Sequence, residues 1–167
     1  HGLLTSKIVQ NLKKKSKFIS VNAQLNSLNT SSHSFSKYNK TDYISLHEGE
    51  LRNEFRDQDL KLDKLINKFI KTRNVKNVVV TRGKKGSFGY LLNQKMNCPA
   101  FSDKILDRIG AGDTFLSISS LFLFLKAPIE IILLISNLCA SQTIANIGTN
   151  KPVNKNNLIN HLKYLIK

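Results

Sequence analysis

Cysteine and methionine are scarce in this sequence of 167 residues. The two cysteines, Cys98 and Cys139, lie much farther apart than the closely spaced pairs of zinc-binding sites, which excludes a zinc site of that kind. Cys139 falls in an apolar stretch, so we expect a buried thiol and a reducing, cytoplasmic location. The only methionine is Met96 and the chain begins with His1, so we expect a piece of a longer protein.

A hydrophobic run long enough to cross a membrane is also absent. The most apolar stretch, residues 115–125, is shorter than the ~20 residues that a membrane-spanning helix needs. Lys126 and Glu130 interrupt its continuation. We therefore expect a helix of the protein core and no membrane span.

Acidic residues are few. The 26 lysines and arginines outnumber the 11 aspartates and glutamates, which gives a net charge of +15 and an isoelectric point near 10.0. This balance favours contact with phosphates, nucleic acid or acidic lipid. Only Lys13-Lys14-Lys15 forms a run, however, and scattered lysines are typical of solvated faces. A basic module that binds nucleic acid stays as an alternative, although the sequence lacks aromatic residues interleaved on a basic face.

Stretches with the pattern of strands alternate with stretches that have helical periodicity. The predicted strands are residues 18–21, 42–46, 77–81 and 88–92. The predicted helices are residues 3–15, 48–55, 60–72, 111–126, 129–147 and 156–166, with an Asn- and Ser-rich connection at 22–39. This alternation predicts an α/β fold with a mainly parallel sheet flanked by helices.

The clearest chemical motif is Asp-Arg-Ile-Gly-Ala-Gly-Asp at residues 107–113, followed at once by an apolar helix. Its glycines allow a ligand to approach the backbone, and the N–H groups at a helix N-terminus attract anions. Asp113 is placed to accept a proton there, so the motif combines an anion site with a base. The alternative is a tight turn in which Asp113 caps the helix. A P-loop and a dinucleotide-binding fingerprint are both absent.

This motif resembles the C-terminal signature of the ribokinase/PfkB superfamily of carbohydrate kinases. The resemblance implies that Asp113 is the catalytic base and that Gly110, Ala111 and Gly112 form the anion hole for the transferring phosphoryl group. Asp107 opens the same motif. It also implies ATP and Mg²⁺ as cofactors.

Two further segments are similar to the family's nucleotide site. Val-Thr-Arg-Gly-Lys-Lys-Gly resembles the family's V-T-x-G-x-x-G turn, which implies that Thr81, Gly83 and Gly86 bind the nucleotide. The helix after the signature carries Asn137 and Ser141, which the resemblance places at the adenine pocket. An ordinary β-turn and plain helix packing are the respective alternatives.

Upstream, the resemblance is less complete. Glu50 stands where the family has the acidic residue that acts on magnesium through water, but His47 replaces the family's asparagine. Asn22, Gln24 and Asn26 are similar to acceptor-site residues in a branch near the heptose-phosphate kinases. A polar loop is the alternative for these three.

The resemblance implies that residues 1–167 are the C-terminal, nucleotide-binding part of a single PfkB-type kinase domain, without its N-terminal substrate and lid part. We expect ATP-dependent phosphorylation of a hydroxyl on a sugar or sugar phosphate, with nucleosides not separated from sugars, and no activity from this part alone. A homodimer of the full-length protein and the absence of a specific nucleic-acid partner are further expectations. The alternative is a degenerate kinase subunit, for which His47 is the only support.

Overall fold

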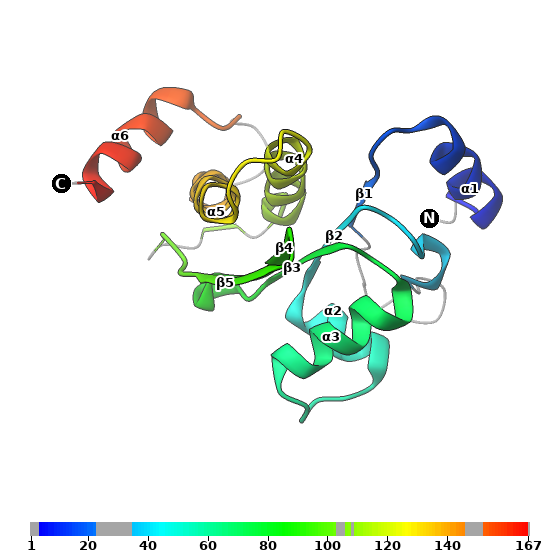
Figure 1. Ribbon diagram of the computed structural model, residues 1–167. Helices are drawn as coiled ribbons and strands as arrows, with labels where there is room; N and C mark the ends of the chain where they lie inside the picture. Colours follow the sequence, from blue (N-terminus) through cyan, green and yellow to red (C-terminus); the bar gives the residue numbers. More distant parts are fainter. Residues whose placement is uncertain (1–3, 23–34, 103–105, 108, 146–151, 167) are drawn as a thin grey trace. The chain divides into compact units, whose positions relative to one another are not determined.

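The computed structural model describes residues 4–22, 35–102, 106–107, 109–145 and 152–166. Its strands form a sheet in the order β1-β2-β3-β4-β5 (Figure 1), with bounds Ser20–Val21, Tyr43–His47, Asn77–Thr81, Ser87–Leu91 and Gln94–Cys98. The α-helices α1 to α6 are Ser6–Lys15, Glu48–Phe55, Leu62–Arg73, Ala111–Phe124, Ile129–Ile144 and Lys155–Leu165. Two 3₁₀-helices, η1 and η2, are Phe35–Tyr38 and Gly83–Lys85.

The first three strands run parallel to one another. Tyr43 of β2 lies opposite Ser20 of β1 on one side and opposite Asn77 of β3 on the other. The first four residues of both β2 and β3 are buried, as in strands that are covered on both faces. This burial explains why their uninterrupted apolar and β-branched runs predicted strands correctly.

The remaining strands extend the sheet as hairpins. Only Leu92 and Asn93 separate β4 from β5, and their φ angles of 52° and 64° are those of a type I′ turn between antiparallel strands. The Leu92 N–H donates a hydrogen bond to Asn77 Oδ1 at 2.9 Å, which stabilises this unusual conformation for a leucine. The predicted α/β class is confirmed, and the sheet that the helices flank is mixed.

The chain divides into two compact units, one comprising His1–Thr81 and Gly89–Lys95, the other Arg82–Phe88 and Met96–Lys167. In the first unit α2 and α3 pack on β2 and β3. Phe69 of α3 contacts the rings of Phe35 and Phe55 edge-on, with centroids 5.4 Å and 6.2 Å away. These aromatic contacts form the centre of the first unit's core.

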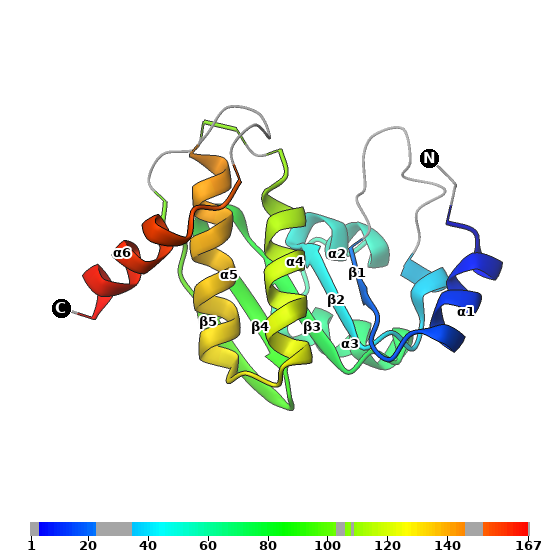
Figure 2. The ribbon, with the colours of Figure 1, turned by 90° about the horizontal axis from the view of Figure 1, so that it is seen from above.

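In the second unit α4 and α5 pack side by side (Figure 2). Their buried residues include serines, Ser119 on α4 and Ser136 on α5, among larger apolar side chains such as Phe115. α6 has no buried residue. In the part of the chain that the structure describes, no helix has the length and apolar character of a membrane span.

Candidate active site

The glycine-rich motif forms the start of α4. Gly110 has φ 78° and ψ −7°, the left-handed conformation that glycine adopts without strain, and the helix begins at Ala111. The Thr114 N–H donates to Gly110 O at 2.9 Å and closes the first turn. The N–H groups of Ala111, Gly112 and Asp113 therefore precede the helical hydrogen-bond pattern and have no acceptor within the helix. Such a group of N–H donors suits an anion.

The end of α5 holds this motif at both sides. The Asp107 N–H donates to Ile144 O at 3.2 Å, and Asp107 Oδ1 accepts from the Ile109 N–H at 2.9 Å. On α4 itself, Thr114 Oγ1 lies 3.0 Å from Thr143 Oγ1 in a hydrogen bond. The turn is thus fixed to α5 before and after Gly110, which presets its conformation.

The carboxylate of Asp113 is exposed in the first turn of α4. Its peptide carbonyl accepts a hydrogen bond from Ser117 Oγ at 2.8 Å, but its side chain forms no hydrogen bond or ion pair with any described residue. Asp113 therefore does not cap its own helix through its side chain. The carboxylate is available to a ligand at the same end of α4 as the N–H groups.

The two glycines of the turn after β3 differ in their surroundings. Gly83 is exposed with φ 56°, and a Cβ there would have open space around it. Gly86 is buried with φ 78°, and a Cβ there would overlap the carbonyl oxygen of Cys98 and lie 2.6 Å from the carbonyl carbon of Pro99. Close packing against the backbone of residues 98–100 explains why position 86 needs a glycine, whereas the open space beside Gly83 leaves room for a ligand. Thr81, the last residue of β3, is half-buried, and its hydroxyl lies 3.5 Å from Leu46 O.

Asn137 is half-buried and forms hydrogen bonds within the second unit. Its Nδ2 donates to Ser87 Oγ at 2.7 Å and to Leu133 O at 2.8 Å. Burial raises the pKa of the nearby Cys98 thiol to about 11, and a hydrogen bond with Asn137 opposes that rise. These contacts favour the packing alternative for Asn137, and its binding of adenine stays a prediction.

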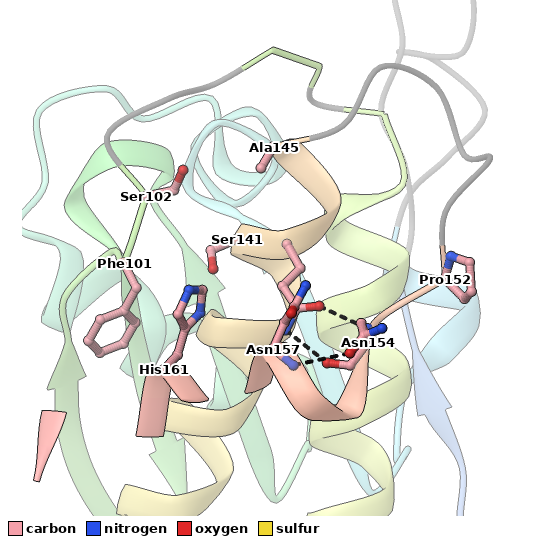
Figure 3. A pocket seen from close by; sticks show the side chains of 9 residues that line it. Phe101, Ser102, Ser141, Ala145, Pro152, Asn154, Asn157 and His161 are labelled. Atoms are coloured by element: carbon pink, nitrogen blue, oxygen red, sulfur yellow. Dashed lines mark hydrogen bonds between the residues drawn. The ribbon is translucent and has the colours of Figure 1, made fainter. Parts of the chain in front are cut away.

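A pocket of about 500 Å³ opens beside the end of α5, within the second unit (Figure 3). Its lining consists of Phe101, Ser102, Ser141, Gln142, Ala145, Pro152, Asn154, Asn157 and His161. An aromatic ring, amides, hydroxyls and an imidazole in one concavity are typical of a small-molecule site. Among the predicted adenine-site residues Ser141 lines this pocket, and Asn137 does not.

Two hydrogen bonds attach the start of α6 to α5 at this pocket. The Asn154 N–H donates to Gln142 Oε1 at 2.9 Å, and Gln142 Nε2 donates to Asn154 O at 3.3 Å. Asn154 Oδ1 also accepts from the Asn157 N–H at 3.0 Å and caps α6. Sequence reasoning missed Phe101, Asn157 and His161 because no motif marks them.

His47 and Glu50 form the capping box of α2. His47 Nδ1 accepts from the Gly49 N–H at 3.1 Å, while Glu50 Oε2 accepts from the His47 N–H at 2.6 Å. The histidine therefore performs the capping that an asparagine would perform. In the described segments, no three His, Cys, Asp or Glu side chains gather to hold a metal ion.

Asn22 follows β1 directly, and its Oδ1 is buried without a hydrogen-bond partner. Gln24 and Asn26 lie outside the described residues. Of the three predicted acceptor-site residues, only Asn22 can thus be placed. An unpaired buried oxygen needs a donor, which a ligand or water would supply.

Comparison with models of known protein families gives one match. The model of the pfkB family of carbohydrate kinases matches residues 5–156, which is most of the chain. This chain belongs to the pfkB family. The predicted resemblance to the ribokinase/PfkB superfamily is thereby confirmed, while the heptose-phosphate kinase branch stays a prediction.

Solved structures share the fold of this pfkB-family chain. Phosphofructokinase-2 from Escherichia coli, in complex with substrates and products, superimposes with a TM-score of 0.79 at 17% identity, over 97% of this chain and 52% of that one. Ribokinase from Thermotoga maritima gives 0.76 at 21% identity, over 94% and 53%. Ribokinase from Arabidopsis thaliana, complexed with ribose and ATP, gives 0.76 at 19% identity, over 95% and 51%. No curated protein sequence matches the chain.

The pfkB-family chain thus spans about half the length of the solved proteins it resembles. At these identities the likeness establishes the fold.

Proposed function

We propose that this chain is the nucleotide-binding part of a kinase that transfers a phosphoryl group from ATP to a hydroxyl of a sugar or sugar phosphate. The observation that carries the proposal is the start of α4. There the left-handed Gly110 precedes three N–H groups without helical acceptors, and the exposed Asp113 carboxylate follows at once. Membership of the pfkB family of carbohydrate kinases supports it.

In this proposal Asp113 accepts the proton of the attacking hydroxyl. The N–H groups of Ala111 and Gly112 face the charge that develops on the transferring phosphoryl group. Because α5 holds the turn at Asp107 and Thr114, these donors need no rearrangement when the substrate arrives. Preorganised donors of this kind stabilise a transition state more than flexible ones.

The pocket beside α5 is the proposed site for the base of the nucleotide. The ring of Phe101 offers a stacking surface, and Ser141, Asn157 and His161 offer polar groups for the edge of a purine. ATP as the phosphoryl donor is supported by the Arabidopsis ribokinase, which has this fold and was solved with ribose and ATP. Thr81 and Gly83 are proposed to contact the nucleotide as well.

Magnesium enters this proposal with the nucleotide. Mg²⁺ usually keeps several waters and is bound through one or two carboxylates plus substrate phosphates. Glu50 fits that mode, because it supplies one carboxylate at the start of α2, where its Oε2 accepts the His47 N–H. Glu50 would then act through water, and the ion would offset the charge of the phosphates.

Asn22 is the proposed contact to the acceptor in this chain, with Gln24 and Asn26 beside it in sequence. Because the solved relatives are about twice as long, we infer that most of the acceptor site lies in a further portion. Activity of this part alone is not expected.

Calorimetric titration of the chain with ATP, with and without Mg²⁺, tests the nucleotide site. Saturable binding is expected, and Gly112→Val should abolish it because the side chain would project where a phosphate lies. Ser117→Val, five residues later on α4 and also exposed, is the matched control and should bind as well as the parent. A folded Gly112→Val protein with unchanged affinity would remove the anion site from the proposal.

The catalytic role needs the full-length protein. There, Asp113→Asn should lower kcat by about 10²–10⁴-fold with little change in the affinity for ATP, since a positioned base contributes about that much. Unchanged turnover would contradict the assignment of Asp113.

A further inference from the structure

The N-terminal quarter of the chain carries positive charge only. Residues 1–41 contain no Asp or Glu, and the first acidic residue is Asp42. The same stretch holds seven lysines, at positions 7, 13, 14, 15, 17, 37 and 40. A charge of +7 in 41 residues is nearly half of the whole chain's +15.

α1 presents an apolar stripe to solvent. Ile8 and Leu12 follow one another at the four-residue spacing of a helix face and are 40% and 48% exposed. Leu4, just before the helix begins, is 44% exposed. Val9, on the adjoining face, is 4% exposed, and α1 contacts η1. The helix thus buries Val9 and leaves apolar side chains uncovered on another face.

Lysines lie beside the uncovered stripe and at its end. Lys7, Lys14 and Lys15 are exposed; at 3.6 residues per turn Lys15 continues the line of Ile8 and Leu12, and Lys7 and Lys14 lie to one side of it. Lys13 points elsewhere, because its ammonium donates to the carbonyl of Asn39. Burial, and then the charge of Lys40, lowers the pKa of Lys13.

No described acidic side chain forms an ion pair with these lysines. In the described part of the chain the ion pairs involve Arg52 and Arg73 with glutamates of α2, and no lysine takes part. The border of the stripe is therefore open to an external anion.

We propose that α1 binds the surface of an anionic lipid bilayer. Leu4, Ile8 and Leu12 would enter the boundary between head groups and acyl chains, while Lys7, Lys14 and Lys15 would contact lipid phosphates and carboxylates. An uncovered apolar stripe combined with flanking lysines supplies both signals that interfacial binding needs. Nucleic acid is the less favoured anion, because contacts with its phosphates make no use of exposed aliphatic side chains. Reversible association with a membrane goes beyond the proposed kinase function and does not depend on it.

Co-sedimentation of the whole chain with lipid vesicles tests this proposal. One vesicle is pure phosphatidylcholine and the other is an equal mixture of phosphatidylcholine and phosphatidylserine. Binding is expected to the mixed vesicles only, and to weaken as salt is raised. Combining K7Q, K14Q and K15Q should reduce that binding by about tenfold or more. The matched control combines K64Q, K71Q and K76Q, which removes three exposed lysines at α3 and just after it and should bind nearly as well as the parent.

A second pair of variants separates insertion from simple charge attraction. I8S with L12S should also lose vesicle binding, whereas Y164S with I166S, which changes two side chains more than 80% exposed near the C-terminus, should retain it. Circular dichroism confirms folding, which these exposed positions should not disturb. Equal losses in the α1 and α3 lysine variants would overturn the proposal, as would full binding by the I8S/L12S variant. Binding of duplex or single-stranded DNA without binding of vesicles would assign the basic surface to nucleic acid instead.

Discussion

The side-chain amide of Asn137 donates a hydrogen bond to Ser87 Oγ at 2.7 Å, joining the middle of α5 to the first residue of β4. Ser87 is 1% exposed, so this bond satisfies a buried hydroxyl. Asn137 therefore has two possible roles: it stabilises the contact of α5 with the start of β4, or it contacts the nucleotide.

Replacing Asn137 by Ala should lower the free energy of unfolding by about 1–3 kcal/mol, because a buried polar partner is left unpaired. Urea unfolding measures this change. N137A combined with S87A should cost less than the sum of the two single changes, since the double variant leaves no unpaired hydroxyl. Unchanged stability together with weakened ATP binding would instead favour the nucleotide role.

Cys98 should make stability depend on alkaline pH. Its pKa is raised from 9.0 to about 11, first by burial, against the opposing hydrogen bond from Asn137. A raised pKa means that the folded state favours the neutral thiol, so this contribution is complete below pH 9 and is lost as pH rises towards 11. Unfolding free energy measured across that window should fall more steeply for the parent than for Cys98→Ala. Parallel curves would show that other groups cause the fall.

The two turn glycines should respond differently to alanine. Gly83→Ala should cost about 1–2 kcal/mol, the price of a left-handed residue with open space around it. Gly86→Ala should cost more, about 3 kcal/mol or above, because its Cβ would also overlap the backbone of Cys98 and Pro99. Denaturant unfolding compares them. A smaller loss at Gly86 than at Gly83 would mean that residues 98–100 move aside easily.

His47 should be replaceable by asparagine without loss of stability. The imidazole Nδ1 and an asparagine oxygen can both accept the Gly49 N–H at the start of α2. H47A should cost about 0.5–2 kcal/mol, whereas H47N should stay close to the parent in thermal unfolding. A loss in H47N as large as in H47A would show that the ring contributes more than a cap.

The pocket beside α5 should bind the base of the nucleotide. His161→Ala should weaken ATP binding by about fivefold or more, the loss of one polar contact, without changing the unfolding free energy, since His161 is exposed. His161 is on α6, so Lys163→Ala on the same helix is the matched control. Equal affinities for ATP in both variants would place the base elsewhere.

The sequence predicted α2 and β3 with the bounds that the structure has, residues 48–55 and 77–81. Both succeed because the local pattern and the tertiary burial agree, as in the buried run Val78-Val79-Val80. β5 was missed because Gln-Lys-Met-Asn-Cys is largely exposed and polar. Its pairing depends on the turn at Leu92 and Asn93, and leucine is not a residue that predicts a left-handed conformation.

The candidate site, like the fold, could be predicted from the sequence only in part. The residues at the start of α4 could be found because neighbouring positions in sequence, Gly110 to Asp113, form one turn. The pocket could not be predicted from the sequence, because its lining residues Phe101, Ser141 and His161 come from three separate segments with no shared spacing. Asn137 shows the third case, in which a sequence pattern fits two roles and only its partners in space distinguish them.

The attachment of Asp107 and Thr114 to the end of α5 determines where the backbone can be cut without separating the two pieces. It closes α4, α5 and the turn between them into a loop whose two ends are tied together. The far end of that loop carries Lys126, which is exposed and has a φ of 56°. A single tryptic cut there would leave both pieces associated and the glycine-rich turn in place. New termini or an inserted reporter peptide would be tolerated at that point for the same reason.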